Sequence, residues 1–189
     1  MLVRPAFLLG GRALRIIPHE KDLRDSGSGR ESGFVRDPSS PILVDKYLED
    51  AVEVDVDAVV DGQNVTIAAI MEHIEQAGIH SGDSCCSIPT HTLDQASLDR
   101  IREHTRQLGL ALNTVGLLNV QYAIRAGEVY VIEANPRASR TVPFVSKATG
   151  RNIASVAPRV MAGFRLAAAD FTSQPVIDFH AATEAVIPL

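Results

Sequence analysis

The sequence of 189 residues contains no tryptophan, only two cysteines and 5% aromatic residues. The two cysteines, Cys85 and Cys86, are adjacent, and adjacent cysteines do not reach the geometry of an ordinary disulfide. We therefore expect a reducing, cytoplasmic location. No apolar run is long enough to cross a bilayer, and the residues after Met1 lack the charged, apolar and small-residue order of a secretory signal. We expect neither a membrane protein nor a disulfide scaffold.

Signatures of several catalytic and binding classes are also missing. The sequence has no His-x-x-x-His or Cys-x-x-Cys spacing for a zinc site, and no Gly-x-x-x-x-Gly-Lys-Ser/Thr phosphate loop. The net charge of -5, from 18 Lys and Arg against 23 Asp and Glu, argues against a broad nucleic-acid or anionic-membrane surface. Hydrophobic residues at 46% and charged residues at 22% are typical of a globular chain. Any binding site should therefore be a local one.

What the sequence does contain is a succession of short strands and helices, which predicts an α/β (α+β) chain. Valines alternate with acidic residues from Val52 to Asp57, so we predict a strand with one apolar and one acidic face. Asp61-Gly62 marks a tight turn after it. The other predicted elements are a strand at 65–71, a hairpin of 119–124 and 128–134 around Ala126-Gly127, a helix at 98–112 capped by Asp94 or Ser97, and a helix within 153–162. Pro158 should begin or kink this last helix.

The first part of the chain and three later segments are less regular. Leu2–Pro5 looks like the end of a strand, so we expect a partner segment upstream of it. Residues 13–18 read as a strand that forms a hairpin with it across Gly10-Gly11. We further predict a surface loop at 25–40, better order from Ile42 onward, a functional loop at 75–89, and a short strand at 185–187 after an irregular stretch.

The segment from Val129 to Arg137 is the most informative for chemistry. Residues i and i+2 of a strand point to one face, so Glu133 and Asn135 should present two oxygen ligands side by side. A three-residue loop at 126–128 would set Gln121 opposite Glu133 on the same face. One carboxylate and two amide oxygens suit Mg²⁺ or Mn²⁺ that carries nucleotide phosphates. On spacing alone, an exposed strand end with ordinary polar residues is the more frequent outcome.

Three cations follow the candidate ligands. Arg137, Arg140 and Lys147 lie within eleven positions of one another. Guanidinium groups fork onto phosphate or carboxylate oxygens and offset the charge that develops in phosphoryl transfer. The usual alternative is a solvated basic loop. The apolar residues from Thr141 to Val145 favour arginines that point into a cleft.

Other candidates are weaker. Gly10-Gly11 with Arg12 could fold over a triphosphate, because glycine lets backbone amides approach phosphate oxygens, but such a pair is more often a simple turn. The stretch Gly78–Gly82, with His80, is similarly unspecific. Lys46 and Glu53 could hold an adenine amine and a ribose hydroxyl, or be surface charges. The two cysteines have no activating neighbour in the sequence and are interpreted as small buried residues.

A family resemblance joins these pieces. Glu53–Asp57, Ile70–Glu75 and Gly78–Ser84 closely resemble the second ATP-grasp unit of the carbamoyl-phosphate synthase large subunit, and the match extends through Asn119–Gln121 and Glu133–Gly150. The Arg-Thr-Val-Pro-Phe-Val run looks like the carboxyl-terminal unit, which in the family phosphorylates carbamate rather than bicarbonate. The similarity covers residues 2 to about 166 and is weak only at 25–40.

The resemblance implies an incomplete ATP-grasp fold with mixed or antiparallel sheets and flanking helices. It implies a partial ATP-grasp domain at 1–166, with a lid-like subdomain at 1–50 and a metal and nucleotide subdomain at 51–166. Residues 167–189 would lead toward an allosteric domain, and Thr183–Pro188 looks like the next strand of the family.

Residue by residue, the resemblance also implies roles. The expected metal ligands are Gln121, Glu133 and Asn135. The expected nucleotide contacts are Arg12, Lys46, Leu48, Glu53, Gly78, Ile79, His80 and Ser81, with Gln121 and Glu133 shared. Arg140 matches an arginine near carbamate, and Arg137 one near the transferred phosphoryl group. The family chemistry needs no covalent nucleophile, since it aligns a carbamate oxygen with the γ-phosphorus and neutralises charge.

The implied activity is an ATP-dependent ligase reaction that phosphorylates carbamate to carbamoyl phosphate, in pyrimidine and arginine biosynthesis. The implied partners are the rest of the large subunit and a glutaminase small subunit. Because those parts lie outside this sequence, we expect weak nucleotide binding and little or no carbamoyl phosphate formation by the chain alone. Two alternatives remain: a non-catalytic remnant that binds nucleotide or pairs with a full-length subunit, and an ATP-grasp ligase for another acid, which the match over 135–150 disfavours.

Overall fold

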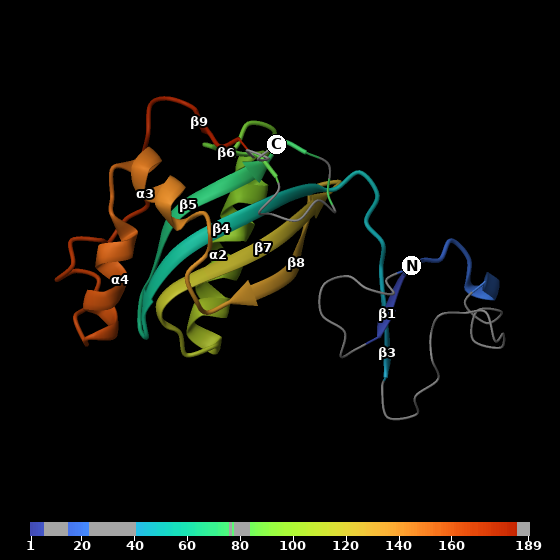
Figure 1. Ribbon diagram of the computed structural model, residues 1–189, viewed down its shortest axis with the longest axis horizontal. Helices are drawn as coiled ribbons and strands as arrows, with labels where there is room; N and C mark the ends of the chain where they lie inside the picture. The colour runs from blue at the N-terminus through green and yellow to red at the C-terminus, as the bar shows by residue number, and fades with distance from the viewer. Residues whose placement is uncertain (6–14, 23–40, 76, 78–83, 185–189) are drawn as a thin grey trace, which may run out of the picture. The chain divides into compact units, whose positions relative to one another are not determined.

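The computed structural model describes residues 1–5, 15–22, 41–75, 77 and 84–184 (Figure 1). The chain divides into two compact units, Met1–Glu49 and Asp50–Leu189. In the described ranges, no helix has the length and apolar character needed to cross a membrane. Each unit is described by itself below.

The first unit is built on a three-stranded antiparallel sheet in the order β2-β1-β3. Its strands are β1 (Leu2–Pro5), β2 (Arg15–Ile16) and β3 (Ile42–Asp45). The amino group of Met1 donates to the carbonyl of Ile17 at 2.8 Å, and the amide of Ile17 donates back at 2.8 Å. The predicted pairing of the first two strands is therefore confirmed. The predicted turn at Gly10-Gly11 and the loop at 25–40 lie outside the described residues.

The second unit contains a six-stranded sheet in the order β8-β7-β4-β5-β6-β9, in which every pair is antiparallel. Its strands are β4 (Val52–Asp61), β5 (Val65–His73), β6 (Cys86–Ile88), β7 (Val115–Arg125), β8 (Glu128–Asn135) and β9 (Ala181–Ala182). Both predicted hairpins are present. The short buried strand β6 corrects the prediction of one continuous loop over 75–89, and the strand predicted at 185–187 lies beyond the described range.

Three helices accompany this sheet in the described part of the unit: α2 (Gln95–Ala111), α3 (Val142–Thr149) and α4 (Ile153–Met161). Asp94 caps α2, because its carboxylate accepts from the amide of Ser97 at 2.8 Å. The sequence missed α3, which ends at Gly150 in the left-handed conformation with φ 67°. The helix predicted within 153–162 is confirmed as α4. Of the two roles predicted for Pro158, a helix start is wrong, because α4 begins five residues earlier behind the Asn152 cap and Pro158 lies inside it.

Two apolar cores lie on opposite faces of the sheet. One core packs β4, β5 and β7 against α2, which lies behind the sheet in Figure 1, and includes Val56, Ile101 and Tyr122. The other packs the sheet against α3 and α4 and includes Val59 and Phe171. Because Phe171 is fully buried, the irregular stretch after α4 is part of the folded unit.

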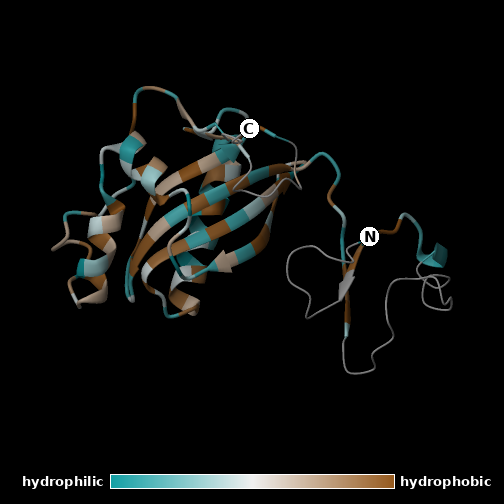
Figure 2. Cartoon of the chain, viewed as in Figure 1, coloured by the Kyte–Doolittle hydropathy of each residue, from teal (hydrophilic) through white to brown (hydrophobic). Residues whose placement is uncertain are grey.

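The central strand β4 has the predicted alternation, with valines on one face and acidic residues on the other. Alternating hydropathy is visible along the strands in Figure 2, but the acidic face of β4 does not meet solvent. Asp55 and Asp57 are each 1% exposed. Buried carboxylates need hydrogen-bond partners, so this face must carry a polar network.

The β7–β8 hairpin reaches its predicted register by an unpredicted route. Its turn has two residues, Ala126 and Gly127, with φ values of 51° and 77° that suit a type I′ turn. A register shift between Gln121 and Tyr122 then adds one residue to the β8 side. Gln121 therefore pairs with Glu133, as a three-residue loop alone would have given.

Candidate functional site

The three predicted oxygen ligands come together on one face of the second unit. Gln121 lies directly opposite Glu133 across the β7–β8 ladder, and Asn119 lies opposite Asn135. The amide of Asn135 donates to Oε1 of Glu133 at 2.8 Å. The Glu133 side chain is exposed, whereas Gln121 and Asn135 are half-buried. The side chains are thus adjacent and within reach of a ligand in solvent.

The donor set fits a hard divalent cation. One carboxylate with two neutral amides offers oxygen donors, which Mg²⁺ and Mn²⁺ prefer. The hydrogen bond between Asn135 and Glu133 uses Nδ2 of Asn135 and Oε1 of Glu133. Oε2 of Glu133 and Oδ1 of Asn135 take no part in it and can ligate a cation. No cluster of three or more His, Cys, Asp or Glu side chains within the described ranges could hold a metal. A cation here would therefore depend on amide as well as carboxylate oxygens.

The predicted arginines follow in the loop 136–141, which connects β8 to α3 (Figure 1). The amide of Arg137 donates to the carbonyl of Asn135 at 2.8 Å, and its guanidinium donates to the carbonyl of Ala138 at 3.0 Å. Arg137 and Arg140 are both exposed. The apolar residues after Arg140 form the buried face of α3 through Val142 and Val145, so they belong to the core and do not indicate a cleft.

Beneath this loop, the carboxylate of Asp57 on β4 accepts three side-chain hydrogen bonds, one from β7 and two from the loop. Its Oδ1 accepts from Nδ2 of Asn119 at 3.0 Å and from the hydroxyl of Ser139 at 2.8 Å. Its Oδ2 accepts from the hydroxyl of Thr141 at 2.5 Å, and the two hydroxyls are 2.8 Å apart. Burial raises the pKa of Asp57, and the hydrogen bonds from Thr141, Asn119 and Ser139 oppose that rise.

A second buried group adjoins Asp57. His73 on β5 places Nε2 at 2.8 Å from Asp55 and Nδ1 at 3.4 Å from Glu53. Asn119 also donates to Asp55, at 3.3 Å, which links the two groups. Burial disfavours the imidazolium, but the interactions with Asp55, Cys86 and Glu53 outweigh it and raise the pKa of His73 to about 11. His73 is therefore protonated at neutral pH and stands between two carboxylates.

The predicted nucleotide contacts are only partly described. Glu53 is half-buried beside His73 in the second unit. Lys46 and Leu48 belong to the first unit, which is not placed relative to the second. The remaining predicted contacts, Arg12, Gly78, Ile79, His80 and Ser81, lie outside the described residues.

The segment that precedes those glycines is anchored by Glu75. Its Oε2 accepts from the hydroxyl of Ser84 at 2.6 Å and from the amide of Cys85 at 2.7 Å. The hydrogen bond from Ser84 lowers the pKa of Glu75 to about 2. The predicted burial of the two cysteines holds fully for Cys86, whereas Cys85 is half-buried.

Sequence reasoning missed the polar layer under the site. Its members are Asp55, Asp57, His73, Asn119, Ser139 and Thr141. The signal available was the acidic alternation inside β4, whose flanking residues are apolar enough for a central strand. A central antiparallel strand that is covered on both faces buries its polar positions too.

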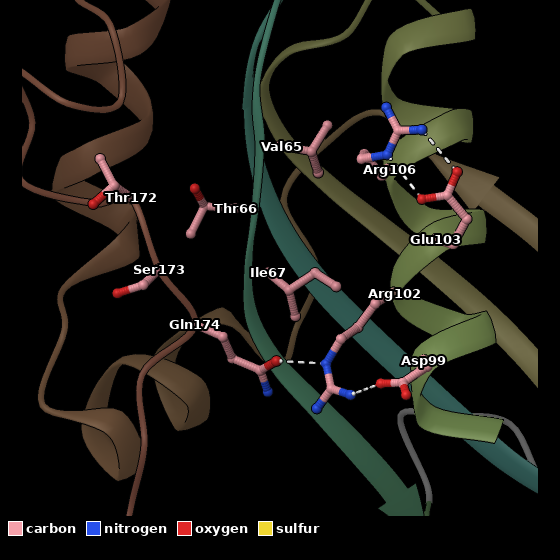
Figure 3. Close-up of a pocket in the computed structure, with 10 residues that line it drawn as sticks. All are labelled: Val65, Thr66, Ile67, Asp99, Arg102, Glu103, Arg106, Thr172, Ser173 and Gln174. Atoms are coloured by element: carbon pink, nitrogen blue, oxygen red, sulfur yellow. Dashed lines mark hydrogen bonds and ion pairs between the residues drawn. The ribbon is translucent and has the colours of Figure 1, made fainter. Parts of the chain in front are cut away.

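A cavity of about 320 Å³ lies elsewhere in the second unit, between α2, the start of β5 and Thr172–Gln174 (Figure 3). Arg102 bridges the two sides, since it donates to Gln174 at 3.1 Å and to Asp99 at 2.9 Å. Arg106 is paired with Glu103 at 2.7 Å. The lining residues that the structure describes include none of the predicted metal or nucleotide residues. The cavity has apolar residues of β5 in its lining, and both of its arginines are already paired.

Comparison with known proteins places the chain in a family. Residues 1–169 match the family model described as carbamoyl-phosphate synthase L chain, ATP binding domain. The chain is 50% identical over 188 residues to the carbamoyl phosphate synthase large chain of Vibrio vulnificus and 53% identical to that of Halobacterium salinarum. All of this chain is covered in both matches, and it spans only 17% and 18% of those relatives.

Solved structures agree on the fold. The biotin carboxylase-beta-gamma-ATP complex from Campylobacter jejuni matches with a TM-score of 0.73 at 18% identity, over 96% of this chain and 40% of that one. Rhizobium etli pyruvate carboxylase matches with a TM-score of 0.72 at 20% identity, over 96% of this chain and 17% of that one. These neighbours are of the ATP-grasp type, so the predicted fold class is confirmed. The family match and the curated relatives establish that the chain belongs to the carbamoyl-phosphate synthase large-chain family and matches its ATP-binding domain over residues 1–169.

Proposed function

We propose that this chain contributes the ATP-dependent step that phosphorylates carbamate to carbamoyl phosphate. The observation that carries the proposal is the arrangement of Glu133 opposite Gln121 and hydrogen-bonded to Asn135, directly before a loop with two exposed arginines. Oxygen donors beside guanidinium groups are what a phosphoryl-transfer site requires. The match to an ATP-binding domain over residues 1–169 supports the same assignment.

In the proposed reaction, a carbamate oxygen forms a bond to the γ-phosphorus of ATP, and the bond from that phosphorus to the β,γ-bridging oxygen breaks, so that ADP leaves. Gln121, Glu133 and Asn135 would hold a divalent cation, Mg²⁺ or Mn²⁺, whose chemistry is to offset the charge of the terminal phosphates. Arg140 would orient carbamate through its carboxylate, and Arg137 would stabilise charge on the transferred phosphoryl group.

Glu53 would fix the nucleotide. Its carboxylate lies 3.4 Å from His73, and this contact holds the side chain near the start of β4. A carboxylate in that position can accept hydrogen bonds from ribose hydroxyls. The predicted contacts at Arg12, Lys46, Leu48 and 78–81 would complete the nucleotide site.

The partners proposed for the reaction are the remaining parts of a large subunit and a glutaminase subunit. This chain spans 17% of the length of the Vibrio vulnificus relative, so a full synthesis of carbamoyl phosphate would require those further parts. We propose a cytoplasmic location, in keeping with the two adjacent cysteines, neither of which forms a disulfide. The reading as a non-catalytic remnant is not favoured, because identity of 50% extends over the whole chain.

The proposal is tested in two steps on the purified chain. Titration calorimetry with Mg-ATP measures binding, and ATP formation from carbamoyl phosphate and Mg-ADP measures the transfer step in reverse. We expect Glu133→Ala to abolish cation-dependent nucleotide affinity, a loss of about 100-fold or more. The neutral amides of Gln121 and Asn135 cannot replace the charge of the carboxylate. Glu128→Ala removes an exposed carboxylate from the same strand and should leave affinity unchanged. Absence of heat at millimolar Mg-ATP, or equal effects of the two changes, would contradict the assignment.

A further inference from the structure

The loop 136–141 carries the two arginines of the proposed site but belongs to no helix or strand. Arg140 lies between Ser139 and Thr141, and both neighbours donate their hydroxyls to one carboxylate, that of Asp57. The loop is therefore tied on each side of Arg140 to a single buried side chain. Ordering an exposed segment in this way lowers the number of conformations that its central residue can adopt.

Thr141 makes an unusual contact for its position. It is the N-cap of α3, where a threonine hydroxyl ordinarily accepts from an amide in the first turn of the helix. Here the side chain makes no capping hydrogen bond. Its hydroxyl instead donates to Asp57 at 2.5 Å and lies 2.8 Å from the hydroxyl of Ser139. The hydroxyl of Thr141 therefore does not cap α3, and instead anchors the loop to Asp57.

Asp57 is also in register with the candidate metal ligands. Asp57 pairs with Asn119 across the β4–β7 ladder, and Asn119 pairs with Asn135 across the β7–β8 ladder. Asn119 donates to Asp57 at 3.0 Å. One buried carboxylate thus contacts both β7, which carries Gln121, and the loop that follows Glu133 and Asn135, so Asp57 links the candidate ligands to the arginine loop.

We propose that Asp57, acting through Ser139 and Thr141, is a positioning residue that holds Arg140 for phosphoryl transfer. The inference rests on the proposed function and adds a residue that contacts no substrate. Misplacement of a catalytic group by about 1 Å can reduce a rate by about 100-fold, whereas nucleotide held by other residues keeps its affinity. The signature of positioning is therefore a fall in the transfer rate at saturation without a matching change in Mg-ATP binding.

The test uses the full chain with Ser139→Ala/Thr141→Val, which removes both hydroxyls and leaves Asp57 in place. We expect the rate of ATP formation from carbamoyl phosphate and Mg-ADP to fall about tenfold or more, while the Kd for Mg-ATP stays within about twofold. Hydrogen exchange of the amides of residues 137–141 should become faster. Thr141→Ser keeps the hydroxyl and should retain most of the rate.

Thr105→Val is the matched control. It removes a buried threonine hydroxyl that contacts Tyr122 on the α2 face of the same sheet, and it should change neither rate nor exchange in 137–141. An unchanged rate in the double variant would overturn the inference, as would a similar loss in Thr105→Val or in Thr141→Ser. A wild-type chain that binds no Mg-ATP would instead contradict the proposed function, and the inference with it. If the chain alone forms too little ATP for a rate to be measured, unchanged exchange of residues 137–141 in the double variant overturns the inference.

Discussion

Both faces of β4 are buried, but one is stabilised by apolar packing and the other by hydrogen bonds and charge. Toward α2, Val54 and Val56 pack with Ile101 and Tyr122 in a core of hydrocarbon contacts. On the opposite face, Asp55 and Asp57 are equally buried and are held by hydrogen bonds and a charged histidine. The apolar face contributes stability through area removed from water. The hydrogen bonds of the polar face fix the orientation of the side chains that they join, as a site on the neighbouring strands requires.

The largest effect should come from the polar face. His73→Ala removes the cation between Asp55 and Glu53 and leaves Asp55, 1% exposed, without its charged partner. Breaking a buried ion pair from one side costs about 4 kcal/mol, so we expect a loss of this size in the free energy of unfolding, measured with urea. His91→Ala is the control, because its imidazole is 44% exposed and 3.5 Å from Glu72. Equal losses in the two variants would remove the distinction between a buried histidine and an exposed one, each beside a buried carboxylate.

Truncation of a side chain on the apolar face should lower the free energy of unfolding slightly less. Ile101 is fully buried in the core under α2, and Ile101→Ala should lower the free energy of unfolding by about 3 kcal/mol through lost burial and a cavity. Leu112→Ala, at the exposed end of the same helix, should cost well under about 1 kcal/mol. Denaturant unfolding of both variants checks the prediction. We also expect Ile101→Ala to leave Mg-ATP affinity unchanged, and a large loss of affinity would show that the faces are coupled.

The smallest effect is a pH dependence that belongs only to the polar face. The pKa of His73 is raised to about 11 in the fold, above its ordinary value of 6.5. Folding therefore takes up a proton between these values, and the stability from His73 is complete below pH 6.5 and is lost as pH rises toward 11. Between pH 7 and pH 9 the free energy of unfolding should fall by about 2 kcal/mol. His73→Gln should flatten this slope, whereas Ile101→Ala should keep it. A flat wild-type profile would contradict a charged His73.

Local patterns predicted the elements that local chemistry determines. The turn residues Asp61-Gly62 and Ala126-Gly127 located both hairpins, and the Asp94 cap with its apolar period located α2. The helix α3 was missed because Thr141 and Pro143 read as a loop beside the arginines. Proline in a first turn is compatible with a helix, and the run from Val142 continues as one.

The polar layer under the site was beyond reach for a different reason. Asp57 bonds to Ser139 and Thr141 across 82 and 84 positions of sequence, and His73 meets Asp55 across an antiparallel ladder. No local period encodes such contacts, so the alternation in β4 did not indicate that its acidic residues are buried. Gln121 and Glu133 were paired correctly because the two-residue turn and the register shift together equal the longer loop that was assumed.

That register shift has a consequence for sequence change. Between the turn and the shift, Tyr122 to Arg125 pair with Glu128 to Val131, and beyond it Gln121 and Asn119 pair with Glu133 and Asn135. A one-residue insertion at Ala126-Gly127 would shift the pairing of the half next to the turn by one residue, so that side chains there change faces of the sheet. If the irregularity were deleted at the same time, the ligand half would be unchanged. Evolution can therefore change the length of the hairpin turn without moving the candidate ligands, provided that the extra residue between Val131 and Glu133 is lost at the same time.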